Sequence, residues 1–554
     1  MSSIKKDIFQ KFRKPGDSRR IFFISISLFL TAFVPRFLDL GTAVIADETL
    51  WMRRSVDFMQ ALMSLDLSGT YQAPHPGVTT MWLGSLSMGG KYLLSGRTNI
   101  SDFLFAAQLP FAIVTSLSIV AAYFMIKRIF NERIAIISGI LLALDPFYLA
   151  YSRIIHLDAL LTSFMTLSLL SFLIYINTSN NKFVVISGIF AGLAVLTKAP
   201  AFFLFPFAAL LLFSCFFRAK ITSPLSVPKL LQKLTKVYLE WIIIAFAVIF
   251  VMWPALWINP FTFIQIFTGG IEEMGMVPHE NGQFFMGAPV MDPGFLFYPI
   301  LILFKTTPIT LIFLAICILF LVLKFMLASN SFGKLERNTL ILILYVLLFT
   351  TAITLGAKKI DRYIIPIFPI IDIIAAVGIF IALEALTNNV FKKSYSKNND
   401  KNSNKNAFAI VVIAVFLFQL FPIIAIHPYP LSYYNPVAGG PSKARETLLI
   451  GGGVGMDLAA KYLNQKEDPQ NITVASDYGF LLSVHFAGKI EPIIADKYEP
   501  NFLDKVDYLV LSVNGVQRQN LRIPQEILDY HYKHEPEYTV NINGIECVWI
   551  HKID

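Results

Sequence analysis

The side chains best suited to acid–base chemistry in this sequence are two adjacent carboxylates, Asp47 and Glu48, in the segment IADETLWMRRS. Paired acids suit a site in which one group takes a proton and the second holds it or a cation in place. The structural alternative is a solvated loop or a helix N-terminus, where the helix dipole favours acidic residues. Spacing alone leaves both interpretations open.

Other unusual polar residues stand near the ends of apolar runs. His75 lies between prolines in QAPHPGVTT, which stiffen the loop around it. In YSRIIHLDALL, Arg153 and His156 are three residues apart and would share a helix face, whereas Asp158 would point elsewhere. A turn histidine without a role and an Asp158 that only caps a helix are the alternatives.

Cations complete this set of polar residues. Lys198 ends the apolar segment LAVLTK, where a lysine often only extends toward the membrane surface. The segment KKIDR places Lys358, Lys359 and Arg362 within five residues. Such a cluster needs a counter-charge, and a lipid phosphate would supply one.

The elements that must position these groups are membrane helices. Only 15% of the 554 residues are charged and 55% are hydrophobic, against about 25% charged in soluble domains. Because about 20 apolar residues cross a bilayer, we searched for runs of that length. Eleven candidate spans emerge, at 21–40, 104–126, 134–151, 157–177, 183–197, 200–217, 238–257, 307–327, 338–355, 363–386 and 407–427.

The distribution of Lys and Arg predicts the topology. The head, residues 1–20, is strongly basic, and together with the alternate connectors on its side it carries 24 Lys and Arg, against 11 in the other connectors without the long C-terminal tail. The positive-inside rule therefore predicts a cytoplasmic N-terminus, with loops 41–103 and 258–306 outside. We expect the protein to lie in the plasma membrane. A cleaved signal peptide is the alternative for the first run. Topology accounts for the net charge of +9, so we expect no nucleic-acid partner.

From about residue 428 the sequence becomes mixed and charged, which predicts a small extracytoplasmic α/β domain over 428–554 beyond the transmembrane module, 21–427. Short β-like runs occur in NITVAS, DYLVLSV and YTVNINGIECVWIHK, whose Asn543-Gly544 marks a hairpin turn. The segment IGGGVGMDLAA lacks the G-x-G-x-x-G spacing and is interpreted as a turn that opens a helix. The three cysteines are Cys215 and Cys317, which lie in apolar runs, and Cys547, which has no partner in its own region. They indicate neither a disulfide scaffold nor a zinc site.

With this topology the unusual polar residues all converge on the outer membrane face. A transporter should instead carry ionisable residues near the midplane of repeated, broken helices, and no such repeat is found. A transporter or flippase of lipid-linked sugars remains the alternative, because it would share apolar grooves and phosphate-binding cations without requiring a base. A sensor would need neither the cations nor the paired acids.

The motifs ADE, HPGV, SRxIHLDA, GLAVLTK and KxxDRYIIPxFP together resemble a known family. They look like the polyprenyl-phosphate-sugar-dependent glycosyltransferases of the GT-C superfamily, in the branch of protein O-mannosyltransferases and the lipid A aminoarabinose transferase. The resemblance covers roughly residues 20 to 430, and the C-terminal domain has a counterpart in the aminoarabinose branch. It implies a mainly α, polytopic GT-C fold that transfers sugar from a lipid phosphate to an acceptor hydroxyl outside the cell.

The resemblance also implies roles for individual residues. Asp47 would be the general base with Glu48 as its neighbour, and Arg153 corresponds to the arginine that organises the family's site. The family's HPPL or KPPL loop appears here as HPGV, so a lysine that contacts phosphate in the aminoarabinose branch is missing. The expected donor-binding and substrate-binding residues are His75, Arg153, His156, Asp158, Lys198, Lys359 and Arg362.

The expected partners are a polyprenyl-phosphate-linked sugar, an acceptor of unknown class and membrane lipids. Direct attack would invert the anomeric centre, whereas a retaining route needs a second carboxylate as nucleophile. We predict no metal ligands and no firm cofactor, although the acidic residues of the loop 258–306 are compatible with a divalent cation.

Overall fold

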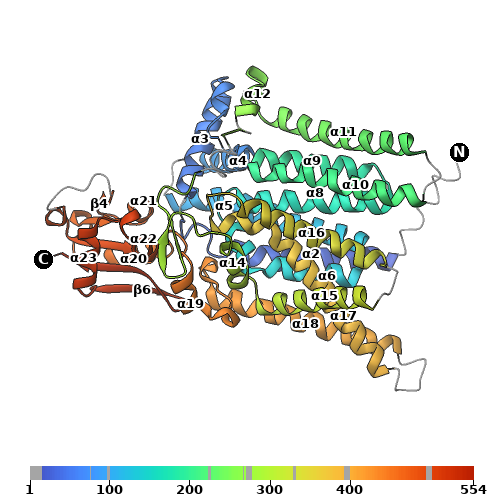
Figure 1. The fold of residues 1–554 in the computed structure, drawn as a ribbon. Coiled ribbons are helices and arrows are strands. Elements are labelled where there is room, and N and C mark those ends of the chain that lie inside the picture. The colour runs from blue at the N-terminus through green and yellow to red at the C-terminus, as the bar shows by residue number, and fades with distance from the viewer. Residues whose placement is uncertain are drawn as a thin grey trace.

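The computed structural model describes residues 15–45, 47–74, 76–96, 100–222, 226–265, 268–269, 277–327, 332–391, 400–494 and 502–553. Figure 1 shows a bundle of long helices with a smaller α/β domain at one end, where the C-terminus lies. We call this end of the bundle the domain end.

The helices of the bundle coincide with the eleven predicted spans. Within the described ranges, nine helical segments are long and apolar enough to cross a membrane. A tenth span forms if two helices that meet at an angle of 60° are counted together, and the remaining predicted run is a shorter apolar helix. The mainly α, polytopic fold is therefore confirmed. The bundle helices are α2 (Pro15–Phe37), α5 (Ile100–Ile129), α6 (Glu132–Leu144), α7 (Pro146–Ser152), α8 (Asp158–Thr178), α9 (Lys182–Thr197), α10 (Leu204–Thr222), α11 (Val227–Met252), α15 (Pro308–Met326), α16 (Lys334–Thr354), α17 (Phe368–Phe391) and α18 (Asp400–Ile426).

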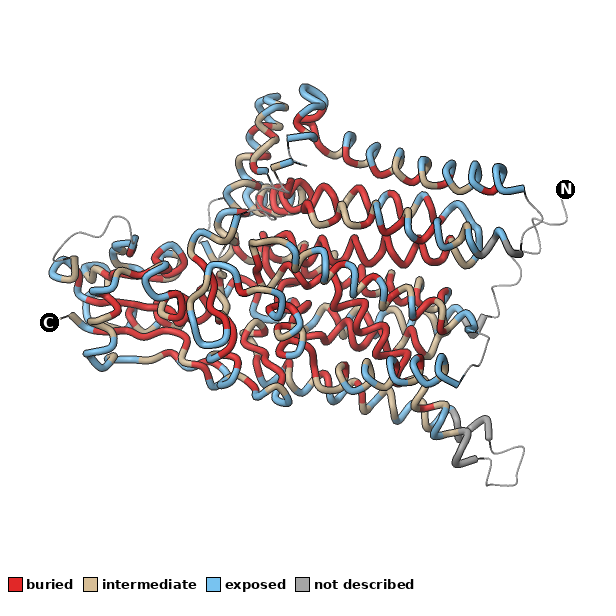
Figure 2. Tube along the Cα trace, viewed as in Figure 1, coloured by how far each residue is buried: buried red, intermediate tan, exposed pale blue. Residues whose placement is uncertain are grey.

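The centre of the bundle is formed by α8 and α17, which are buried along nearly their whole length (Figure 2). Peripheral helices such as α15 and α18 instead leave rows of large apolar side chains exposed, including Leu319, Phe325 and Phe418. In water such a surface would be costly, whereas in a bilayer it needs no cover.

The bend between α6 and α7 prepares the turn that carries several polar residues. Pro146 begins α7 and restricts Asp145 to an extended backbone conformation, with ψ of 118°. The Asp145 carboxylate then accepts a hydrogen bond from the Tyr148 N–H at 2.6 Å, which caps α7. The chain leaves α7 at Arg153 and enters α8 at Asp158, inside the domain end of the bundle.

Two segments outside the spans contain structure of their own. After α2 come α3 (Glu48–Met63) and α4 (Val78–Ser95). The segment 258–306 contains a hairpin of β1 (Gln283–Phe285) and β2 (Ala288–Val290), followed by α14 (Phe297–Lys305). Glu272 and Glu273 lie outside the described residues.

The C-terminal domain is a five-stranded mixed sheet with helices packed on it. The strand order is β4-β3-β5-β7-β6, with β3 parallel to β4 and β5, and β7 antiparallel to β5 and β6. Asn543 and Gly544 join the last two strands with positive φ angles, as a two-residue hairpin requires. The elements are α19 (Gly440–Thr447), α20 (Met456–Leu463), β3 (Thr473–Ser476), α21 (Gly479–Leu482), β4 (Lys489–Pro492), β5 (Tyr508–Ser512), α22 (Val513–Arg518), α23 (Gln525–Lys533), β6 (Tyr538–Ile542) and β7 (Ile545–Lys552).

Buried contacts hold the C-terminal domain on the bundle. Lys305, at the end of α14, donates to the backbone oxygens of Leu431 at 2.9 Å and Tyr433 at 3.1 Å. Its ammonium also lies 3.7 Å from the centre of the Tyr434 ring. The β1–β2 hairpin adds a backbone hydrogen bond from Met286 to Thr447 at 2.9 Å. The hairpin and the domain therefore enclose the domain end together.

Candidate functional site

Asp47 lies at the mouth of the bundle, immediately before α3. It adopts a left-handed backbone conformation with φ of 76°, which is unusual for a residue with a side chain. Its Oδ2 accepts a hydrogen bond from Arg362 Nη2 at 2.7 Å and lies 3.6 Å from His156 Nε2. The side chain stays 36% exposed, so one face of the carboxylate remains accessible.

Behind Asp47 the ion pairs continue into the bundle. His156 Nδ1 lies 2.8 Å from Asp158 Oδ2, and Lys198 Nζ donates to Asp158 Oδ1 at 2.7 Å. Arg362 Nε lies 3.5 Å from Asp158 Oδ2, so this arginine touches both acids. We call Asp47, His156, Asp158, Lys198 and Arg362 the charged cluster. Four elements supply it: the turn before α3, the start of α8, the end of α9 and the 3₁₀ turn Asp361–Ile367.

The charged cluster keeps Asp47 ionised. Burial acts to raise the pKa of Asp47, but the nearby imidazole of His156 and the charges of Arg362 and Lys198 outweigh it. The pKa of Asp47 therefore lies well below its usual range. At neutral pH this carboxylate can accept a hydrogen bond from a hydroxyl group or hold a cation.

Glu48, although adjacent to Asp47, has a different environment. It is fully buried and accepts hydrogen bonds from the backbone N–H of Ile45 at 2.9 Å, from Gln108 Nε2 at 2.9 Å and from the N–H of Ile155 at 3.1 Å. Burial raises the pKa of Glu48 to about 7, although these hydrogen bonds oppose the shift. Glu48 therefore ties the first loop to α5 and to the turn before α8.

The cavity beside Asp47 lies between the bundle and the C-terminal domain and has a volume of about 290 Å³. This volume approaches the lower end of ordinary small-molecule sites, about 300–1,000 Å³. Its polar lining residues are Asp47, Tyr151, His279, Glu280, Asn281, Gln283, Asp361, Arg362, Tyr478, Asn514, Arg518 and Arg522. Three separate regions of the chain, the bundle, the hairpin segment and the C-terminal domain, therefore form one site.

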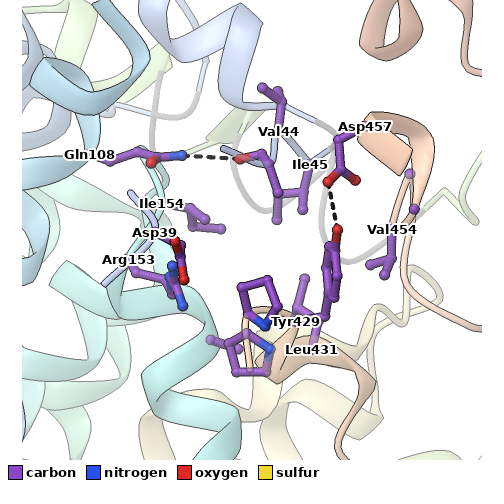
Figure 3. A pocket seen from close by; sticks show the side chains of 16 residues that line it. Asp39, Val44, Ile45, Gln108, Arg153, Ile154, Tyr429, Leu431, Val454 and Asp457 are labelled. Atoms are coloured by element: carbon purple, nitrogen blue, oxygen red, sulfur yellow. Dashed lines mark hydrogen bonds between the residues drawn. The ribbon is translucent and has the colours of Figure 1, made fainter. Parts of the chain in front are cut away.

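Arg153 is not brought to Asp47. It lies beside Asp39 in a neighbouring cavity of about 40 Å³ (Figure 3) and donates to the Leu38 backbone oxygen. A hydrogen bond of 2.6 Å from the Tyr429 hydroxyl to Asp457 closes another wall of this cavity. The two cavities share Ile45 and Leu431 in their linings.

Lys359 and Arg362 also diverge, although they are three residues apart. Lys359 is buried and donates to Asp292 Oδ1 and to the Gly356 backbone oxygen, each at 2.7 Å. It thereby fastens the segment that follows the β1–β2 hairpin. Only Arg362 of this pair lines the cavity beside Asp47.

His75 lies outside the described residues. The loop that follows it contacts the end of α9. The Gly77 N–H donates to the Thr197 backbone oxygen at 3.1 Å, next to Lys198. Gly77 has φ of 59°, and a Cβ there would lie 2.2 Å from the Trp51 ring. Only glycine fits this position, which explains why the loop reads HPGV.

Sequence reasoning assigned no role to several residues of the site. The Tyr151 hydroxyl donates to the Asp361 carboxylate at 3.3 Å, and both residues line the cavity. Asp361 stands inside the cationic segment KKIDR and Tyr151 lies two residues before Arg153, so their positions were a usable signal. The cavity residues of the C-terminal domain carry no recognisable motif. In the described part of the chain, no three His, Cys, Asp or Glu side chains form a group that could hold a metal ion.

Residues 87–257 match the family model described as dolichyl-phosphate-mannose-protein mannosyltransferase. The resemblance to the GT-C superfamily is confirmed. Two of the GT-C-like motifs, SRxIHLDA and GLAVLTK, fall inside the matched segment, and they contribute His156, Asp158 and Lys198 to the charged cluster. A comparison with curated proteins gives no match.

Solved structures to which the chain is similar include AglB, the archaeal oligosaccharyltransferase from Archaeoglobus fulgidus, in complex with an inhibitory peptide and a dolichol-phosphate. The identity is 14%, with 96% of this chain and 73% of that chain covered and a TM-score of 0.49. ArnT from Cupriavidus metallidurans bound to undecaprenyl phosphate gives 13% identity, 97% and 98% coverage and a TM-score of 0.45. The S. cerevisiae protein O-mannosyltransferase Pmt1-Pmt2 complex bound to the sugar donor gives 18% identity, with 48% of this chain and 38% of that chain covered and a TM-score of 0.34.

Proposed function

We propose that this protein is a membrane glycosyltransferase that moves a sugar from a polyprenyl-phosphate-linked donor to an acceptor hydroxyl on the extracytoplasmic face. The observation that carries the proposal is the position of Asp47, an ionised and partly exposed carboxylate held by Arg362 at a cavity above the bundle. The match to a family of dolichyl-phosphate-mannose-dependent enzymes supports this class of donor.

In the proposed reaction the acceptor oxygen attacks the anomeric carbon of the donor while the bond from that carbon to the phosphate oxygen breaks. Asp47 takes the proton of the acceptor hydroxyl, and the electron pair of the broken bond leaves with the polyprenyl phosphate. A single displacement of this kind inverts the anomeric centre. Arg362 is the cation of the charged cluster that lines the cavity, so it is assigned to the leaving phosphate.

The contact between Arg362 and the donor phosphate would also make Asp47 a stronger base. A carboxylate with a depressed pKa is a weak base while Arg362 neutralises it. When the donor phosphate shares the Arg362 guanidinium, the hold on Asp47 weakens and its basicity rises. Proton removal is thereby coupled to the presence of the donor.

An apolar groove next to the site suits the polyprenyl tail of the donor. The groove has a volume of about 500 Å³ and is lined by α2, by Leu38 directly after it and by α18, through residues such as Val34 and Leu420. It ends at His427, which contacts Asp39 in the wall of the small cavity beside the site. An isoprenoid chain lying there would bury apolar surface without any polar partner.

The proposed topology has the C-terminal domain outside and the N-terminus in the cytoplasm. It is tested by cysteine labelling with a membrane-impermeant maleimide in intact cells, with a cysteine introduced at the exposed Lys489 or Lys182. Labelling at 489 without permeabilisation, and at 182 only after it, is expected. The reverse pattern would contradict both the topology and a reaction on the outer face.

The activity is tested with purified protein in proteoliposomes, supplied with a panel of radiolabelled polyprenyl-phosphate sugars and a membrane extract as the source of acceptors. Appearance of label in a product that no longer carries the lipid phosphate is expected. Movement of the intact donor across the bilayer without transfer would favour a flippase instead. Parallel reactions with EDTA, and with Mg²⁺ or Mn²⁺ restored, test whether a divalent cation takes part.

A further inference from the structure

Two arginines of the C-terminal domain line the cavity from the side opposite the bundle. Arg518, the last residue of α22, is only 6% exposed, and its Nη1 donates to Asn514 Oδ1 at 3.1 Å. Its buried Nε–H has no hydrogen-bond acceptor in the part of the chain that the structure describes. Among the described residues no carboxylate forms an ion pair with Arg518. A desolvated guanidinium without a counter-ion is costly unless a ligand supplies the charge.

Arg522 is held beside it in a similar way. Its Nη2 donates to the Asp477 backbone oxygen at 2.9 Å, and its guanidinium lies 4.1 Å from the centre of the Tyr478 ring. Asp477 Oδ2 is 3.8 Å from Arg522 Nε, but the Asp477 carboxylate already accepts hydrogen bonds from the Ser512 N–H and hydroxyl. The guanidinium of Arg522 therefore has a fixed orientation, and Asp477 neutralises its charge only in part.

The potential inside the cavity is correspondingly positive. His279 lies in the lining, and burial together with the charges of Arg518, Lys358, Arg362 and Arg522 lowers the pKa of His279 to about 4. Four cations from two parts of the fold therefore act on one half-buried position. Of the three acids that line the cavity, Asp47 is already paired with Arg362, Asp361 accepts hydrogen bonds from Tyr151 and from the Arg362 N–H, and Glu280 is exposed.

We infer that Arg518 and Arg522 form an oxyanion subsite that binds a phosphate or carboxylate group of one of the two substrates. The inference deepens the proposed function and rests on it for the identity of the ligand. A planar guanidinium presents parallel N–H donors that match such groups. Gly451 and Gly452 line the cavity and place no side chain in it. The Gly-rich turn therefore leaves space for a ligand beside the two arginines. The anionic group belongs either to the leaving phosphate of the donor or to a charged acceptor, such as a phosphorylated or uronic-acid-containing glycan.

The test is binding of inorganic phosphate to the full-length protein in a detergent without phosphorus, followed by ³¹P NMR line broadening. Wild type should bind phosphate saturably, and R518Q and R522Q should each bind it at least about tenfold more weakly. R445Q is the matched control, because Arg445 pairs with Glu546 in the same domain and does not line the cavity. R518K and R522K keep the charge and should retain part of the affinity, should a glutamine variant fail to fold.

A second arm adds saturating undecaprenyl phosphate. Phosphate binding that persists assigns the subsite to the acceptor, whereas displacement assigns it to the donor phosphate. The inference is overturned if wild type binds no phosphate, or if R518Q and R522Q bind it like wild type. This readout needs no sugar transfer, so phosphate binding without any transferase activity would refute only the proposed function.

Discussion

Replacing Arg362 by glutamine should impair both donor binding and the ionisation of Asp47. Arg362 Nη2 donates to Asp47 at 2.7 Å and its Nε lies 3.5 Å from Asp158, so the substitution removes a positive charge shared by two acids. If the same guanidinium also holds the donor phosphate, losing that charge-assisted contact costs about 1.5–3 kcal/mol. This corresponds to about 10- to 150-fold in affinity for undecaprenyl phosphate and in kcat/KM for the donor.

The substitution should also change the pH dependence. Without Arg362, the carboxylate of Asp47 loses a charge that favours its ionised form, while burial still favours the protonated form. The pKa of Asp47 therefore rises, and the acidic limb of the profile of kcat/KM against pH moves to higher pH in R362Q. The profile is measured with a saturating acceptor and a limiting, radiolabelled donor.

K359Q is the control for this series, because Lys359 stands three residues away but pairs with Asp292 outside the cavity. It should leave donor affinity and the acidic limb close to wild type. If R362Q behaves like K359Q in both measurements, Arg362 neither contacts the phosphate nor tunes Asp47, and the assignment of the charged cluster to the reaction is wrong.

Two further predictions concern the support of the site. K198M removes the lysine that pairs with the buried Asp158 and leaves only His156 and Arg362 beside that carboxylate, so it should destabilise the protein by up to about 3–5 kcal/mol, measured as a lower thermal unfolding midpoint in detergent. D158N/K198M should recover part of the loss, and no recovery would contradict the pairing. For Glu48 the folded pKa of about 7 exceeds its unfolded value of about 4.5, so its contribution to stability is present below pH 4.5 and is lost as the pH rises through 7. The unfolding midpoint of wild type should fall across this interval relative to E48Q, and parallel curves for the two proteins would disprove a buried, protonated Glu48.

Local sequence properties were sufficient to predict the bundle. A membrane span needs only an apolar run of sufficient length, so each of the eleven runs coincides with helical structure, including the shortest, which ends beside Lys198, and 134–151, which is the bent pair α6 and α7. The strands of the C-terminal domain are also local patterns, and the Asn543-Gly544 turn was visible as a dipeptide. The Gly-rich segment does open α20, as its composition indicates.

The pairing of the site residues was beyond the sequence. Asp47 and Arg362 are 315 positions apart, and their contact depends on how α3, α8 and the 3₁₀ turn at 361–367 pack together. The left-handed backbone at Asp47 sends this carboxylate to the cavity while Glu48 turns into the core, although the two residues are neighbours. Arg518 and Arg522 have no motif, because nothing in an isolated α/β domain indicates that its surface will close a cavity on the bundle.

The central claim is that Asp47 accepts the proton of the acceptor hydroxyl, and single-turnover sugar transfer by D47N in proteoliposomes tests it most directly. Asparagine keeps the shape of the side chain but cannot take a proton. We expect transfer to slow by about 100- to 10,000-fold while binding of undecaprenyl phosphate stays close to wild type. D47N that transfers sugar at the wild-type rate would contradict the claim.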